Sequence, residues 1–147
     1  MTSLTLVRRI KARPSIVFQA LTTAEGISQW WGPDAGPVLI AEADPRVGGR
    51  FRVRFRRLED ATEYETRGEF LELVPPERVV MSWRWQDGLV DPGESRVEMT
   101  LRAVPEGTEI TLSHTRLSDE ESRASHEAGW MGALDKLTAR LTEGGWS

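Results

Sequence analysis

The clearest signal along the chain is the spacing of its apolar residues. From residue 50 to residue 56, arginines alternate strictly with Phe51, Val53 and Phe55. Strict alternation is typical of a β-strand with one buried face. A period of two also runs through residues 63–70, 79–85, 95–102 and 109–114, and more weakly through 4–11 and 38–42. The pattern therefore predicts a sheet of about seven strands.

The end of the chain has a helical period instead. Ser118-Asp119-Glu120-Glu121 has the form of a capping box, and a helix is predicted from residue 119 to about residue 142, ended by Gly144-Gly145. Its apolar stripe is formed by Trp130, Leu134, Leu137 and Leu141, at spacings of four, three and four. We expect Ala124, Ala128 and Met131 to widen this stripe.

Two short helices are predicted between the first two strands. Pro14 suits the first turn of one helix. Thr22-Thr23-Ala24-Glu25 is a candidate capping box for the other, which is expected to end at Trp30-Trp31, before Gly32-Pro33. Turns are expected at Asp87-Gly88 and Asp91-Pro92-Gly93.

Charge predicts how the strands pair, because the register must keep the apolar faces together. One register places Arg52 opposite Arg67 and forms these pairs: Phe55 with Tyr64, Val53 with Thr66, Phe51 with Gly68, Arg56 with Glu63, Arg54 with Glu65, and Arg50 with Glu69. In a later hairpin, Leu101 pairs with Ile110 and Met99 with Leu112. We interpret the arginine-rich strand as a salt-bridged solvent face rather than a nucleic-acid surface.

Together these elements predict an α+β fold. Strands joined by short turns form an antiparallel meander, which must cover one of its faces. The long C-terminal helix offers the matching apolar stripe, so the sheet is expected to curve around it. No linker or repeat divides the chain, and residues 1–147 are expected to form a single domain.

Composition narrows the function. The 147 residues are 39% hydrophobic and 29% charged, as in soluble globular proteins, and carry a formal net charge of −4. That charge argues against a nucleic acid or an anionic membrane as partner. The chain has no cysteine, which excludes disulfides, thiolate metal sites and a cysteine nucleophile. No apolar stretch approaches the roughly 20 residues of a membrane helix, and a cytoplasmic location is expected.

Several motifs resemble a known family: Arg9-x-x-x-x-Pro14-x-x-Val17-Phe18-x-Ala20-Leu21-Thr22, Trp30-Trp31-Gly32-Pro33, Gly48-Gly49-Arg50-Phe51, Gly68-x-Phe70-Leu71-Glu72-Leu73-Val74-Pro75-Pro76-Glu77-Arg78 and His126-x-x-Gly129-Trp130-x-x-x-Leu134-x-x-Leu137. In this order they resemble the homologues of the heat-shock protein 90 ATPase activator, within the START and birch-pollen-allergen (SRPBCC) superfamily. The resemblance implies the helix-grip fold. The eukaryotic co-chaperones carry a further N-terminal domain, whereas this chain starts at its first predicted strand.

The inward faces predict the lining of a ligand cavity: Phe51, Val53, Phe55, Tyr64, Thr66, Phe70, Met81, Trp83, Trp85, Val97, Met99, Leu112, His114, His126, Trp130, Met131 and Leu134, with Leu137 closing it from the helix. Ser95 also faces inward and could orient a ligand. The alternative is a fully packed core. Gly129 and Gly132 lie inside the long helix, where glycine is unfavourable, and indicate either access to a cavity or close approach to the sheet.

Three functions stay open at this point. The preferred function is the binding of a small apolar or aromatic molecule, by a monomer or homodimer without a cofactor. The second is an enzyme of the cyclase or hydrolase type, using His114, Tyr64 or one of the acids expected near the cavity mouth, Asp34, Glu42 and Asp44. The third is a chaperone-interaction protein of the stress response. No phosphate loop, nucleophile elbow or HExxH motif is present, and two histidines without a carboxylate on their faces do not predict a metal site.

Overall fold

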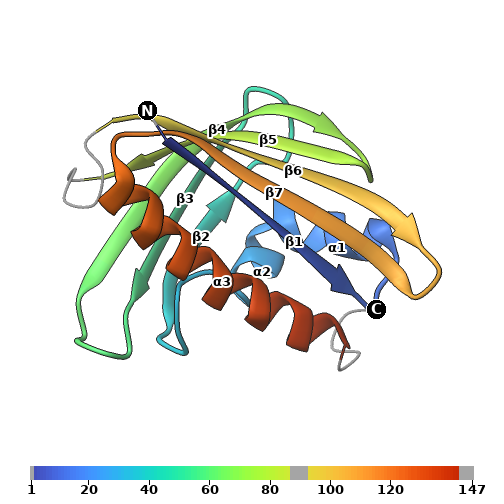
Figure 1. Ribbon diagram of the computed structural model, residues 1–147, viewed down its shortest axis with the longest axis horizontal. Helices are drawn as coiled ribbons and strands as arrows, with labels where there is room; N and C mark the ends of the chain where they lie inside the picture. Colours follow the sequence, from blue (N-terminus) through green and yellow to red (C-terminus); the bar gives the residue numbers. More distant parts are fainter. Residues whose placement is uncertain (1, 87–92, 143–147) are drawn as a thin grey trace.

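A computed structural model describes residues 2–86 and 93–142, and within them the element order is the predicted one (Figure 1). The elements are β1 (Thr2–Ile10), α1 (Pro14–Thr22), α2 (Ala24–Ile27), β2 (Val38–Ala43), β3 (Arg50–Arg56), β4 (Glu63–Val74), β5 (Arg78–Trp85), β6 (Ser95–Val104), β7 (Gly107–Leu117) and α3 (Glu120–Thr142). The expected turns at 87–88 and 91–92 and the helix stop at 144–145 lie outside the described residues. None of the described helices has an apolar run long enough to cross a bilayer.

The strands form one antiparallel sheet in the order β1-β7-β6-β5-β4-β3-β2. Strands β2 to β7 follow one another as a meander, and β1 joins the far edge beside β7. The segment with α1 and α2 therefore carries the chain from one edge of the sheet to the other. Figure 1 shows the sheet curving over α3, which is the predicted helix-grip arrangement.

The predicted register of the β3–β4 hairpin is confirmed pair by pair, from Arg50 opposite Glu69 to Arg56 opposite Glu63. The pairs predicted between β6 and β7 are confirmed as well. Both follow from the rule that a slip of one residue would turn every apolar side chain of a strand to solvent.

Glu65 offsets the predicted like-charge contact between Arg52 and Arg67. Its side chain is only 3% exposed, and its Oε2 lies 3.1 Å from Arg52 Nε and 2.6 Å from Arg67 Nε. Arg54 Nη1 lies 3.6 Å from Glu65 Oε1. The ion pairs of this face thus run diagonally as well as directly across the strands. Burial alone would raise the pKa of Glu65, but the hydrogen bonds from Arg52 and Arg67 outweigh it and lower the pKa below its ordinary value.

The long helix buries the predicted stripe of Trp130, Leu134, Leu137 and Leu141. The prediction that Ala124, Ala128 and Met131 widen this stripe is wrong. All three residues are exposed. The stripe widens in the opposite direction, through Ser122, His126 and Ala133. Steps of four and three residues place these side chains in one row with Trp130, whereas residues 124, 128 and 131 form the neighbouring row that faces solvent.

Two helix starts lie one residue later than predicted. Thr23, not Thr22, caps α2: its backbone is extended, and its Oγ1 accepts a hydrogen bond from Gly26 N. Thr22 is instead the last residue of α1 and donates to Phe18 O. At α3, Asp119 Oδ1 accepts from Ser122 N. The helix α2 ends at Ile27, and Trp30 and Trp31 belong to the segment after it.

We predict that Glu65→Gln lowers the free energy of unfolding at pH 7 and flattens its dependence on pH. A carboxylate whose pKa is lowered in the folded state stabilises the fold above its unfolded pKa, and this stabilisation is lost as the pH falls through the folded pKa. Urea unfolding of both proteins between about pH 3 and pH 7 measures the effect. The control is Glu69→Gln on the same strand, where the side chain is less buried. Identical pH profiles for Glu65→Gln and the wild type would contradict the prediction.

Candidate ligand cavity

A cavity of about 390 Å³ lies at one end of the space between sheet and helix. Its walls come from the segment 30–34, the ends of β3, β4 and β5, and the first half of α3. Exposed residues Glu59, Ser125 and Ala128 lie at its rim, so it opens to solvent there. The lining consists of Trp30, Trp31, Gly32, Pro33, Asp34, Phe55, Arg57, Glu59, Tyr64, Trp83, Trp85, Ser125, His126, Ala128, Gly129, Trp130 and Ala133.

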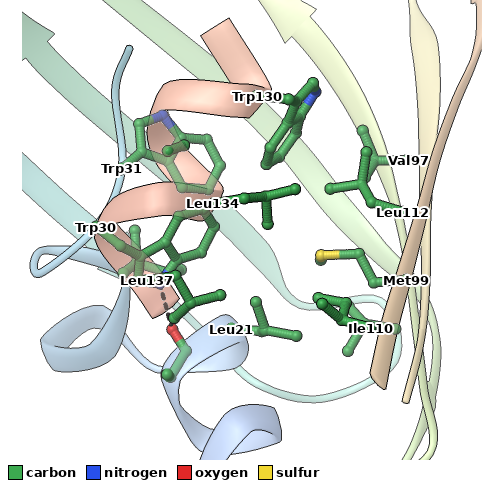
Figure 2. Packing of buried hydrophobic residues seen from close by; sticks show 14 of the residues in the cluster. Leu21, Trp30, Trp31, Val97, Met99, Ile110, Leu112, Trp130, Leu134 and Leu137 are labelled. Carbon is green, nitrogen blue, oxygen red and sulfur yellow. Dashed lines mark hydrogen bonds between the residues drawn. The ribbon is translucent and has the colours of Figure 1, made fainter. Parts of the chain in front are cut away.

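The structure divides the predicted lining residues into three groups. Six of them line this cavity: Phe55, Tyr64, Trp83, Trp85, His126 and Trp130. A second group is buried in the core and does not line the cavity: Phe51, Val53, Thr66, Phe70, Met81, Val97, Met99, Leu112, His114, Leu134 and Leu137. Figure 2 shows Val97, Met99 and Leu112 of the sheet packed against Leu134 and Leu137 of the helix. Met131 is 45% exposed and does not line the cavity.

Seven aromatic side chains form a large part of the wall. Trp31 stacks on Trp83, with ring centroids 5.1 Å apart and planes at 14°. Trp83 in turn lies 5.2 Å from Trp130 of α3, and 5.8 Å from Trp85. Tyr64, Phe55 and Trp85 form a cluster in which the ring centroids are 5.8, 5.9 and 6.2 Å apart. These rigid rings surround the space with apolar surface that cannot easily collapse into it.

The segment that carries Trp31 is fixed to α3 by Lys136. The ammonium Nζ donates to Trp31 O at 2.9 Å and to Asp34 O at 2.7 Å. Burial lowers the pKa of Lys136, while the nearby Asp34 opposes that shift. Gly32, between the two carbonyls, has φ +98, which a residue with a side chain rarely adopts.

Asp34 is the predicted mouth acid that does reach the cavity. Its carboxylate accepts hydrogen bonds from Gly36 N, Leu58 N and Glu59 N, at 2.9, 3.0 and 3.3 Å. Burial would raise its pKa, but these backbone N–H groups and Arg57 lower it below the ordinary value. The carboxylate is therefore ionised at neutral pH and ties the 34–36 segment to the 57–59 segment.

The other two predicted acids lie elsewhere. Glu42 is 3.5 Å from Arg52 on the outer face of the sheet, and Asp44 is 2.6 Å from Arg46. Neither lines the cavity. Within residues 2–86 and 93–142, no group of three histidine, aspartate or glutamate side chains is placed to hold a metal ion.

His126 has both ring nitrogens engaged. Its Nε2 accepts the indole N–H of Trp85 at 3.0 Å, so Nδ1 carries the proton and donates to Ser122 O at 2.7 Å. This assignment makes the ring a neutral imidazole. The ring closes one side of the cavity and fixes the orientation of Trp85.

His114 lies behind the cavity wall, and the roles of its two ring nitrogens are exchanged relative to those of His126. Its Nδ1 accepts the indole N–H of Trp130 at 3.0 Å, and its Nε2 donates to Ser95 Oγ at 2.7 Å. The centroids of the two imidazole rings are 4.8 Å apart. The histidines therefore supply buried acceptors to two of the tryptophans that line the cavity.

Sequence periodicity did not predict that residues 30–33, Arg57 and Glu59 form part of the cavity wall, whereas Asp34 and Gly129 had been placed near the cavity on other grounds. The adjacent tryptophans followed by Gly-Pro were the signal for the segment, but their spacing fits neither a strand nor a helix. Their place depends on the contacts with Trp83 and Lys136, which join residues far apart in the sequence.

Comparison with known proteins identifies the family. Residues 11–142 match the family described as Activator of Hsp90 ATPase homolog 1-like protein. The chain belongs to this family. Among curated proteins, none matches the chain.

Two solved structures of similar chains support the same fold for this member of the Activator of Hsp90 ATPase homolog 1-like family. A protein from Chromobacterium violaceum has 27% identity and a TM-score of 0.86, over 95% of this chain and 96% of its own. The AHSA1 protein from Silicibacter pomeroyi has 29% identity and a TM-score of 0.84, over 95% and 97%.

The two glycines of α3 have different surroundings. A Cβ added at Gly132 would collide with the carbonyl oxygen of Pro33, so this glycine allows close approach of the 30–34 segment. A Cβ at Gly129 would meet only Pro33 Cβ, at 4.0 Å, which is ordinary contact. Gly129 borders the cavity, and it has no steric need to be glycine.

We therefore predict opposite effects of alanine at the two positions. Gly132→Ala should lower the free energy of unfolding by about 1–3 kcal/mol through overpacking. Gly129→Ala should raise it by about 1 kcal/mol, because alanine is the better helix former. Urea unfolding measures both. A destabilised Gly129→Ala would show that the space beside Gly129 is not available.

Proposed function

We propose that this member of the family binds a small apolar or aromatic molecule in the cavity between the sheet and α3. The observation that carries the proposal is the open cavity of about 390 Å³ in which seven of the 17 lining residues are tryptophan, phenylalanine or tyrosine. Small-molecule sites are typically concave, largely apolar and about 300–1,000 Å³ in volume.

Hydrogen bonding at the site favours binding over acid/base catalysis. Asp34 accepts three backbone N–H groups, both nitrogens of His126 are engaged, and Glu59 Oε2 lies 2.8 Å from Arg57 Nη2. A general base needs a lone pair within reach of the substrate. In this arrangement both carboxylate oxygens of Asp34, both ring nitrogens of His126 and Oε2 of Glu59 are engaged by the protein itself.

We expect Gly129→Leu to abolish binding without loss of the fold. Leucine is a good helix former, and its side chain would extend from the cavity wall into the space a ligand needs. Native mass spectrometry of freshly purified protein tests this: a copurified small molecule should be present in the wild type and absent from Gly129→Leu. A fluorescent apolar probe offers a second readout.

The matched control is Ala124→Leu, which places the same side chain on the exposed row of α3. This variant should bind as the wild type does. Equal binding by the wild type and Gly129→Leu would place any ligand elsewhere and would remove the basis of the proposal.

The family's description favours a second candidate, an activator-like role toward the Hsp90 ATPase. The ATPase rate of Hsp90 with and without the protein tests it. If the chain acts through its surface, stimulation should be the same with wild type and Gly129→Leu, because that substitution lies inside the cavity. A rate that does not change on addition of the wild type would reject this candidate and leave the cavity proposal standing.

A further inference from the structure

Arg57 is the one cationic side chain among the described residues that line the cavity. Its side chain is 33% exposed. A guanidinium beside aromatic rings is well suited to pair with the carboxylate of an aromatic acid, because its donors match the two carboxylate oxygens. Whether the cavity takes acids or uncharged molecules therefore depends on whether Arg57 is available.

The positive charge of Arg57 is already compensated by residues near it in the chain. Its Nη2 donates to Glu59 Oε2 at 2.8 Å, and it forms a further hydrogen bond with the side chain of Tyr64. Burial alone would lower the pKa of Arg57, but this hydrogen bond and the charges of Asp60 and Glu59 outweigh it and raise the pKa above its ordinary value. An incoming carboxylate would have to compete with these partners.

A second cation near the cavity, Lys136, is compensated as well. Its ammonium does not line the cavity; its Nζ donates to Asp34 O at 2.7 Å, and its charge interacts with the Asp34 carboxylate. Two carboxylates, those of Asp34 and Glu59, belong to the lining itself. An anionic ligand would therefore lose its hydration next to two negative charges, and no unpaired cation among the described lining residues would replace the water.

We propose that the Arg57–Glu59 ion pair makes the cavity selective for uncharged aromatic molecules, and that Glu59 is the residue that excludes aromatic carboxylates. The inference rests on the proposed function, because it assigns the specificity of the same cavity. Glu59 suits this role because its side chain is 73% exposed at the rim and contributes little to the core. Loss of its charge would remove a repulsion and release Arg57 Nη2, so this one exposed side chain decides the charge of the ligand.

Two matched probes test the selectivity: 2-naphthamide and 2-naphthoate have nearly the same size and shape, and at pH 7 only the naphthoate is charged. In equilibrium dialysis the wild type should bind the amide about tenfold more tightly than the naphthoate, as one uncompensated charge allows. Glu59→Gln should bind the naphthoate about tenfold more tightly than the wild type does. Its affinity for the amide should stay within about twofold of the wild-type value, because the uncharged probe does not respond to the lost charge.

The matched control is Glu106→Gln, in the turn between β6 and β7. It removes the same charge from an exposed glutamate that also pairs with an arginine, since Glu106 Oε2 lies 3.9 Å from Arg9 Nη1. Glu106 does not line the cavity, so this variant should bind both probes as the wild type does. The double variant Glu59→Gln/Arg57→Gln should lose most of the gain in naphthoate binding, because the released guanidinium is absent.

The outcomes separate this inference from the proposed function. If neither the wild type nor Glu59→Gln binds a probe, the cavity is not a site for aromatic molecules, and both proposals fail. Equal or tighter binding of the naphthoate by the wild type would overturn the selectivity and leave the binding function intact. An unchanged naphthoate affinity in Glu59→Gln, or the same gain in Glu106→Gln, would overturn the role of Glu59. The comparison of the two probes in the wild type tests the selectivity without any variant.

Discussion

The stack of Trp31 on Trp83 is the contact on which the site depends, because it joins the segment between α2 and β2 to the sheet. Trp130 lies against the same ring of Trp83, so three parts of the chain meet at one tryptophan. Lys136 and Gly132 then hold the segment against α3, the first through two carbonyl groups and the second by having no side chain. Because the rings are rigid and are held from three directions, the space beside them stays open while the rest of the interior is filled.

The strands and their register could be predicted because a sheet with one buried face allows few alternatives. In β3 and β4, alternation fixes which residues face inward, and a shift by one would expose Phe51 and bury Arg52. The stripe of α3 followed from the same logic with a period of 3.6, but its width did not. Whether Met131 or Ala133 extends the stripe depends on how the helix is rotated against the sheet, and that rotation is set by contacts such as Gly132 with Pro33.

The candidate site was predictable only where it belongs to a strand or to the stripe of α3. Phe55, Tyr64, Trp83 and Trp85 were found by alternation and Trp130 by helical spacing, whereas Asp34 was placed near the mouth without its role as a backbone acceptor. The aperiodic parts of the wall come from long-range contacts. The hydrogen bond of Lys136 with Trp31 O joins residues that are about a hundred positions apart, and no local sequence pattern predicts it.

The histidines explain how so many indoles can be buried in one place. Each buried indole N–H needs an acceptor, and carbonyl oxygens inside a sheet are already used by the ladder. His126 and His114 each offer one nitrogen to a tryptophan and direct the other to Ser122 or Ser95. Their position near the cavity therefore has a structural reason that does not require catalysis. Among the described residues, the buried indole N–H of Trp83 has no acceptor.

The glycines of α3 give independent support for an open wall. Gly132 is required by the close approach of Pro33, so its cost to the helix is explained by packing. Gly129 has no such reason, since a methyl group would fit beside Pro33. Positions that break a local rule without a packing reason are expected at functional sites. Gly129 weakens the helix where α3 borders the cavity. This cost is explained if glycine is needed there to keep the cavity open.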